Sequence, residues 1–114
     1  MAFQLDLPKF EAANAQVLGA SVDFNDANKA WAEKMGITYP LMSDVRRQVG
    51  KAYGVLFDDP KMADDPKTIP AYLRTKRVWM VIDTQGVVRY IKVAAQGEVQ
   101  PPTDEMLKVL SESK

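Results

Sequence analysis

The chain has 114 residues, of which 46% are hydrophobic and 26% charged, so we expect one small globular domain over residues 1–114. Fifteen basic and fifteen acidic residues cancel, and the net charge therefore favours neither a nucleic acid nor a membrane as a partner. Because the sequence contains neither cysteine nor histidine, disulfides, thiol catalysis and the usual zinc or iron sites are excluded for these residues. We expect no cofactor and no metal.

The first residues lack the basic and apolar regions of a signal peptide. No apolar run approaches the roughly 18 residues that a membrane-spanning helix needs. A cytoplasmic protein is therefore the default expectation.

Residues 2–14 are predicted to form a helix, because Phe3, Leu7 and Phe10 recur at helical spacing. Pro8 lies inside this segment and predicts a kink or a restart of the helix. Residues 16–22 form a short apolar run, which favours a strand buried on both faces.

Asn25 is a candidate cap for a helix over about residues 26–35, which Gly36 would end. On this helix we expect Trp31 to be a core anchor. The residues predicted to share its inward side are Ala27, Ala30 and Lys34.

Residues 37–42 are predicted to form a short strand, in which Pro40 would suit an edge position. Ser43 would then cap a helix over about residues 44–53, which Gly54 would end. The side chains expected to point inward are Val45, Val49, Ala52 and Tyr53.

Residues 57–72 contain the tetrapeptide Asp-Asp-Pro-Lys twice and a further proline, which predicts a loop without a packed element. The aspartates do not follow the alternating pattern of a calcium-binding loop, so we favour a solvated surface loop over a metal site.

Residues 77–83 and 87–93 are predicted to pair as an antiparallel hairpin across a turn that ends at Gly86. The first strand contains the continuous apolar run VWMVI and is expected to be buried on both faces. Thr103 is the expected cap of a last helix near residues 104–112. Alternating strands and helices predict an α/β fold with one mostly parallel sheet, covered on both faces, to which the hairpin adds an antiparallel strand.

Four segments occur together in an order that resembles one enzyme family. They are VLGASVD (17–23), WAEKMGITYPLMSD (31–44), VGKAYGV (49–55) and RVWMVIDTQGVVRY (77–90). Their order and spacing resemble a peroxiredoxin of the alkyl hydroperoxide reductase/thiol-specific antioxidant type. The resemblance implies a thioredoxin-like, three-layer sandwich with a mixed sheet.

The resemblance also implies that pieces of the fold lie outside this sequence. In the family, an N-terminal hairpin, a central strand and a loop with the peroxidatic cysteine come before the first helix, so the chain resembles a peroxiredoxin truncated at its N-terminus. The strands at 17–22 and 77–83 would then lose the central strand that they share. We expect either a rearranged sheet or close association with another copy, since an open apolar edge invites pairing; poor folding of the isolated chain is the third outcome.

Arg77 is the one active-site residue that the resemblance carries over, because it stands six residues before Asp83, as the family's arginine does. That arginine stabilises the thiolate and the negative charge that develops as the peroxide bond breaks. The alternative is a structural arginine that extends to solvent or pairs with a carboxylate, and Arg74 and Lys76 lie close enough in sequence to be confused with it. Asp23 and Asp44 follow predicted strands, where capping is favoured over ligand binding.

The family activity is thiol-dependent reduction of hydroperoxides, with a thioredoxin-like reductant as partner. Because the sequence contains no cysteine, we predict that this chain alone is inactive. The alternative function is a non-catalytic, thioredoxin-like interaction module. It would form a homo-oligomer through its open sheet or through the family's interfaces.

Overall fold

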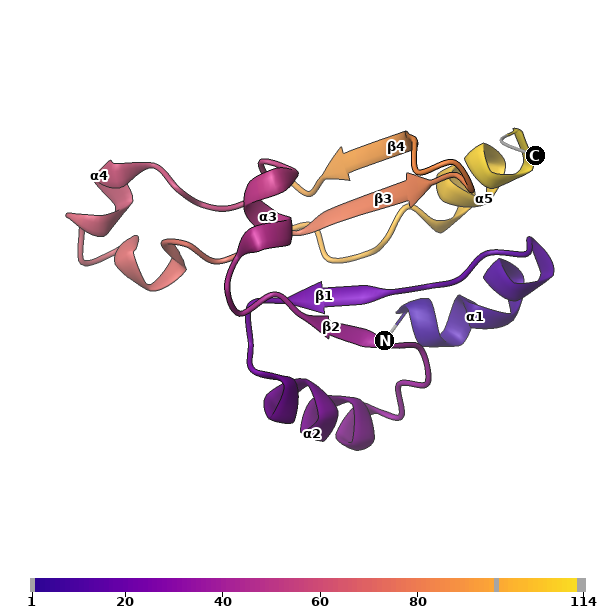
Figure 1. The fold of residues 1–114 in the computed structure, drawn as a ribbon, viewed down its shortest axis with the longest axis horizontal. Helices are drawn as coiled ribbons and strands as arrows, with labels where there is room; N and C mark the ends of the chain where they lie inside the picture. Colours follow the sequence, from indigo (N-terminus) through magenta and orange to yellow (C-terminus); the bar gives the residue numbers. More distant parts are fainter. Residues whose placement is uncertain (1, 96, 113–114) are drawn as a thin grey trace.

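Helices and short strands alternate along the chain in a computed structural model that describes residues 2–95 and 97–112 (Figure 1). The helices are α1 (Ala2–Ala12), α2 (Asn25–Met35), α3 (Gln48–Ala52), α4 (Pro60–Ala63), the 3-10 helix η1 (Ile69–Ala71) and α5 (Thr103–Glu112). The strands are β1 (Gly19–Ser21), β2 (Leu41–Ser43), β3 (Val78–Ile82) and β4 (Val88–Val93). The predicted order of elements is confirmed, except between residues 57 and 72.

The strands form two separate two-stranded sheets within the described residues. β1 pairs with β2 in parallel, and β3 pairs with β4 in antiparallel register with a bulge after Val81. The expectation of one continuous mixed sheet is therefore wrong for this chain, because no described strand lies between β1 and β3 and the two do not pair. A rearranged sheet in which β1 and β3 pair directly is not formed in the described residues either.

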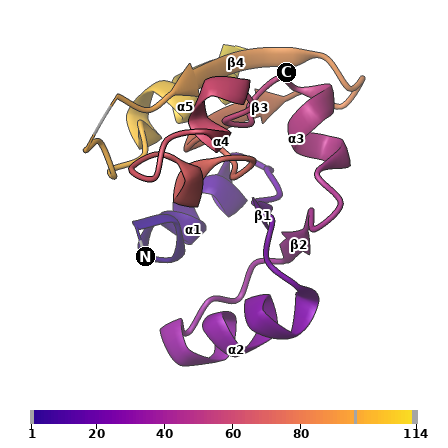
Figure 2. The same ribbon diagram turned by 90° about the vertical axis from the view of Figure 1, so that its left-hand side faces the viewer.

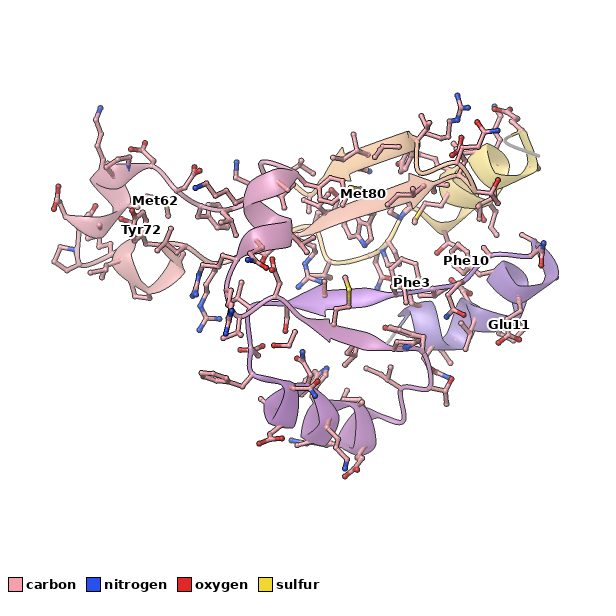
Figure 3. All side chains as sticks on the ribbon, in the orientation of Figure 1. Phe3, Phe10, Glu11, Met62, Tyr72 and Met80 are labelled. Carbon is pink, nitrogen blue, oxygen red and sulfur yellow. The ribbon has the colours of Figure 1, made fainter. Side chains whose placement is uncertain are left out.

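Helix α1 holds the two sheets in one structure. Phe10 is 2% exposed and joins the core of the hairpin, and the rings of Phe3 and Phe10 lie 5.5 Å apart between α1 and that core (Figure 3). On the other side, Gln4 Oε1 accepts a hydrogen bond from the Thr38 amide at 2.8 Å, next to β2. The helix runs through Pro8 without the predicted restart. Pro8 has no amide hydrogen, so the Gln4 carbonyl loses its helical partner at this position.

The main core lies on one face of the hairpin. Its buried members are Phe10, Trp79, Val81 and Met106. Figure 2 shows α1 and α5 on this face of the β3–β4 sheet and α3 on the opposite side. The hydrophobic face of α5 covers the strands, as its apolar spacing predicts.

The opposite face of the hairpin is covered only in part, which corrects the prediction that β3 is buried on both faces. Pairing of Met80 with Ile91 and of Ile82 with Val88 places these apolar side chains on one side of the sheet. Ile82 is 46% exposed and Ile91 49%. A continuous apolar run therefore marks a strand whose second face is only partly covered, since Val78 and Met80 are half-buried there and Ile82 is exposed.

Helix α2 covers one face of β1–β2 with a polar contact. Asn28, and not Trp31, is the buried residue of this helix; Trp31 is 50% exposed, so its predicted role as a core anchor is wrong. The inward side is rotated relative to the apolar pattern because Asn28 hydrogen-bonds to both strands. Asn25 is the first helical residue and Phe24 occupies the cap position without a side-chain bond, so the predicted Asn25 cap is not formed either.

The predicted loop at 57–72 contains two short helical turns, α4 and η1, contrary to the expectation of no packed element. Met62 and Tyr72 lie together between them (Figure 3). Thr68 Oγ1 donates to the Met62 carbonyl at 3.0 Å and ties the turns together. The Asp59 side chain accepts a hydrogen bond from the Lys61 amide and caps α4, which begins at Pro60. An aspartate cap followed by a proline is a favourable start for a helix.

The helices in the described part of the chain do not have the features of membrane-spanning segments. None of those in the described part of the chain combines the length and the apolar character that a span requires.

Candidate functional site

The carboxyl ends of the parallel strands mark the first candidate site. Figure 1 shows the arrowheads of β1 and β2 at the same end of the molecule as the start of β3. In open α/β sheets, ligands bind at the carboxyl ends of the parallel strands. Arg77 directly precedes β3, so its backbone lies at this end.

Arg77 has a fixed backbone and an unpaired side chain. Its carbonyl accepts a hydrogen bond from the Ala94 amide at 2.8 Å, which extends the hairpin ladder by one residue. Its side chain is exposed, and no hydrogen bond or ion pair within the described residues engages its guanidinium. An unpaired guanidinium on a fixed backbone is suited to bind an anion.

The two neighbouring basic residues differ from Arg77 in their surroundings. Lys76 Nζ lies 5.8 Å from the centroid of the Phe57 ring, as a cation–π contact, and its amide donates to the Val55 carbonyl. Arg74 precedes the strand by several residues, and its backbone bridges Ala71 and Phe57. Of the three, Arg77 alone directly precedes the first residue of β3.

Asp44 is a structural residue at the same end of the sheet. Its carboxylate accepts hydrogen bonds from the amides of Val49 at 3.0 Å and Gly50 at 2.7 Å. The group that holds the first turn of α3 is thus Asp44, whereas the predicted cap, Ser43, donates its hydroxyl to the Asp23 carbonyl. The capping interpretation of Asp44 fits these bonds better than ligand binding does.

The side of helix α3 that packs against the rest of the molecule is not the side that the sequence predicts. Val49 and Tyr53, which were expected to point inward, are 38% and 41% exposed. The buried glycine at position 50 takes the inward place, where an added Cβ would lie 2.6 Å from a Leu56 methyl carbon. A glycine is needed for this close approach.

Asn28 is the residue at this end that sequence reasoning missed. Its Oδ1 accepts from the Ser21 hydroxyl at 2.8 Å and its Nδ2 donates to the Met42 carbonyl at 3.2 Å. The side chain therefore joins β1 to β2, and its 6% exposure leaves no room for a ligand. The sequence offered no distinct signal for it, because α2 carries several other polar residues and a polar residue on a helix normally points to solvent.

Shifted pKa values belong to Asp83 and Tyr90 of the hairpin, to Glu98 in the loop after β4, and to Tyr39 before β2, where burial raises the pKa of the hydroxyl. Hydrogen bonds from the Val87 amide above all, and from Arg89 and Gln85, hold the pKa of Asp83 below its usual range. The hydrogen bond from Tyr90 to Glu105, 2.6 Å long, raises the pKa of the Tyr90 hydroxyl to about 12. The Ala95 amide and Lys92 lower the pKa of Glu98. Each shift follows from a local structural contact, and none involves Arg77.

No group of acidic side chains in the described ranges is arranged to hold a metal ion. An open cavity of about 450 Å³ lies between α1 and the start of α5, and its lining includes the Asp6–Lys9 ion pair and three further acidic or hydroxyl side chains, Thr103, Asp104 and Glu105. Thr103 donates to Asp6 across it at 3.1 Å. The candidate arginine, Arg77, is not among the residues that line this cavity.

The chain is similar to known proteins over almost all of its length. The AhpC/TSA family profile matches residues 1–91. The chloroplastic 2-Cys peroxiredoxin BAS1 of Hordeum vulgare is 31% identical over 109 residues, which is 90% of this chain and 46% of that protein. The solved structure of Mycobacterium tuberculosis AhpC is 27% identical, with a TM-score of 0.72 over 96% of this chain and 56% of that one.

A second solved structure is similar to this chain in fold, although the two sequences share less identity. Peroxidoxin BcpB from Mycobacterium tuberculosis has a TM-score of 0.79 over 99% of this chain and 67% of its own, at 23% identity. The predicted thioredoxin-like α/β fold is thereby confirmed. The chain spans about half the length of the curated relatives it matches.

Proposed function

Because the chain belongs to the AhpC/TSA family, we propose that its 114 residues form the arginine-bearing part of a thiol peroxidase that reduces hydroperoxides. The observation that carries the proposal is Arg77, whose unpaired, exposed guanidinium sits on a fixed backbone at the carboxyl ends of β1 and β2. Residues 1–114 would act as one partial thioredoxin-like unit. The role of Arg77 as the family's active-site arginine is part of this proposal.

The proposed chemistry needs a thiolate that these residues do not contain. The thiolate sulfur would attack one oxygen of the hydroperoxide, the O–O bond would break, and the leaving oxygen would take a proton to become water or an alcohol. Sulfur is oxidised to a sulfenic acid, and a thioredoxin-like dithiol would reduce it again. Arg77 would stabilise the thiolate and the negative charge on the leaving oxygen. It is protonated at any working pH.

A peroxide assay tests the proposal in two steps. The 114-residue protein is mixed with hydrogen peroxide, dithiothreitol and a thioredoxin system, and we expect no consumption above a protein-free blank. A thiol-bearing strand and loop are then joined ahead of the first helix, and peroxide consumption is expected to appear. Activity in the first step would contradict the proposal, as would its absence from a folded protein in the second.

Arg77 is tested in the joined protein. Removing one preorganised donor to a developing negative charge lowers a rate by about 10²–10³-fold, so we expect a loss of this size in Arg77→Ala. Arg74→Ala is the matched control, because it removes the same charge three residues earlier. Equal losses in the two variants would show that Arg77 acts only through net charge.

A second candidate function is a non-catalytic association module, and the observation that favours it is the unpaired edges of β1 and β3. Such an edge is a template for pairing with another chain. Sedimentation across a range of concentrations, together with amide exchange, tests it. A monomer whose β1 and β3 amides are fully protected would argue against association.

A cytoplasmic location is a further part of the proposal. Some matched relatives are named as chloroplastic, so the location of this chain needs its own measurement. Fractionation of cells that express the chain with a detectable tag is the direct test.

A further inference from the structure

The side chain of Arg47 is held in place by two backbone oxygens and has no counter-ion. Its Nε donates to the Leu73 carbonyl at 2.7 Å, and its Nη1 donates to the Val45 carbonyl at 3.0 Å. Both bonds are partly buried, and none of the ion pairs within the described residues includes Arg47. A guanidinium has five N–H groups, so three of them stay free to bind another acceptor.

Two further arginines stand next to this fixed guanidinium. Arg46 precedes Arg47 in the chain, and Arg74 follows Leu73, whose carbonyl Arg47 binds. Both residues are exposed, and their side chains make no hydrogen bond or ion pair in the part of the chain that the structure describes. Because arginine side chains are long, both can turn toward the guanidinium of Arg47. Three positive charges therefore meet where α3 begins and the segment after η1 passes.

The backbone that carries these arginines is fixed by other contacts. The Phe57 amide donates to the Arg74 carbonyl at 2.9 Å, and Leu56 pairs with Thr75. The Leu56 side chain also lies against Gly50 of α3, where an added Cβ would be 2.6 Å from one of its methyl carbons. The two segments are thus joined independently of the exposed arginine side chains.

Acidic side chains close in sequence do not neutralise this cluster. The Asp44 carboxylate accepts two backbone amides of α3, and none of the ion pairs in the described ranges includes Asp44 or Asp58. Asp58 and Asp59 are exposed directly after Phe57. A long polyanion such as a nucleic acid would meet these two aspartates and be repelled, whereas a compact anion avoids them.

The number and kind of the cations favour a phosphate group. A guanidinium presents parallel N–H groups, which match the oxygens of a phosphate or of a carboxylate. A phosphate monoester carries about −1.5 to −2 charges at pH 7, whereas a carboxylate carries only one. Three arginines are therefore better matched by a phosphate than by a single carboxylate.

We propose that Arg46, Arg47 and Arg74 form a binding site for a phosphate group, carried by free phosphate or by a small phosphate monoester. The free N–H groups of Arg47 bind two of the phosphate oxygens, and the two exposed arginines close on the remaining ones. The site does not include Arg77 and is separate from the peroxidase chemistry proposed above.

Calorimetric titration of the 114-residue chain tests the site. The probes are inorganic phosphate and phenyl phosphate, with acetate as the comparison, all at pH 7.5 and at an ionic strength matched with sodium chloride. We expect one phosphate to bind per chain, and acetate to bind roughly tenfold more weakly or less, because its charge is smaller. Equal affinity for the two phosphates assigns the site to free phosphate, and tighter binding of phenyl phosphate assigns it to a monoester.

Variants of the two exposed arginines test their contribution. Arg46→Gln and Arg74→Gln should each weaken phosphate binding by about threefold to tenfold, because each removes a cation close to the surface. Both side chains are exposed and unpaired, so the variants should fold. Lys29→Gln is the matched control, since it removes an exposed charge from α2, and it should leave the affinity unchanged.

Arg47 is tested by a change that keeps its charge. Arg47→Lys loses the planar fork, and we expect an affinity at least about tenfold lower. If this variant unfolds, as judged by Trp79 fluorescence, NMR of the unchanged chain decides. Phosphate should then shift the Arg47 Nε–H resonance more than acetate does at the same ionic strength.

Three results would overturn the inference. The first is phosphate binding no tighter than acetate binding, and the second is a loss in Lys29→Gln equal to the losses in Arg46→Gln and Arg74→Gln. The third is binding that disappears in Arg77→Gln but persists in those two variants, which would assign the anion to Arg77. Because these titrations contain neither thiol nor peroxide, their failure leaves the peroxidase proposal to its own assay.

Discussion

The Arg77 carbonyl accepts a hydrogen bond from the Ala94 amide, with 2.8 Å between oxygen and nitrogen, in line with the β3–β4 ladder. This bond fixes the backbone at the first position before β3, while the side chain extends away without a partner in the described structure. The arginine is held in place by backbone atoms alone. Its side chain is therefore available for function at little cost to the fold.

The first prediction follows from this separation of backbone and side chain. Arg77→Ala should change the free energy of unfolding by no more than about 0.5 kcal/mol, because substitutions of exposed, unpaired side chains rarely do more. Urea unfolding, followed by Trp79 fluorescence, measures it, with Arg74→Ala as the matched control. Destabilisation well above that of the control would mean that Arg77 has a structural partner.

The second prediction concerns the polar joint between α2 and the parallel sheet. Asn28→Ala leaves the Ser21 hydroxyl and the Met42 carbonyl without their buried partner, so we expect a loss of about 1–3 kcal/mol in the free energy of unfolding. Ser21→Ala should cost less once Asn28 is already alanine. A double-mutant cycle measures this coupling, and strictly additive losses would contradict a direct bond.

The sequence predicts most elements of this fold because their signals are local. Apolar spacing identifies α1 and α5, and the turn that ends at Gly86, with φ of 81°, identifies the hairpin. The sequence predicts a kink or a restart of the helix at Pro8, and no packed element in the segment with the doubled aspartate-proline pair. In the structure, one lies within α1 and the other starts α4.

Burial was harder to predict than secondary structure, because it depends on what lies across from a residue. Trp31 and Tyr53 belong to apolar stripes, yet the inward positions on their helices are taken by Asn28 and Gly50. In both cases a polar bond or a close backbone contact fixes the helix against its neighbours. Such contacts involve partners far apart in sequence, and a hydrophobic pattern does not reveal them.

For the candidate site, the role of Arg77 stays a prediction that comes from the family resemblance. The spacing of Arg77 from Asp83 singles out one arginine among neighbours, and the structure shows an unpaired guanidinium there. The joining role of Asn28 had no comparable signal. The strands form two separate sheets because β1 and β3 do not pair with each other, and the sequence of neither strand predicts this.

The third prediction is a dependence of stability on acid. Hydrogen bonds from Val87 first, and from Arg89 and Gln85, lower the folded-state pKa of Asp83 below its unfolded value of about 3.9. The stabilisation is therefore present above that value and is lost as the pH falls through the folded pKa. Asp83→Asn should flatten the decline in unfolding free energy between about pH 4 and 2. Glu98→Gln is the comparison, because the pKa of Glu98 in the loop after β4 is also lowered and its replacement should flatten the decline as well. An unchanged decline in Asp83→Asn would contradict the prediction.

The fourth prediction contrasts two apolar residues on the same helix. Phe10 is 2% exposed and packs in the core with Trp79 and Met106, whereas Leu5 is 82% exposed. Phe10→Ala should cost about 3–5 kcal/mol in the free energy of unfolding, because it removes buried area and leaves a cavity. Leu5→Ala should stay within about 0.5 kcal/mol, since alanine is also a good helix former.

The comparison of these two variants also tests how α1 supports the rest of the molecule. If Phe10 is what attaches α1 to the hairpin, its loss should speed exchange at the Thr38 amide as well, because that amide bonds to Gln4 on the same helix. Leu5→Ala should leave the Thr38 amide unchanged. Faster exchange at Thr38 in both variants would show that α1 is held by the Gln4 contact and not by its place in the core.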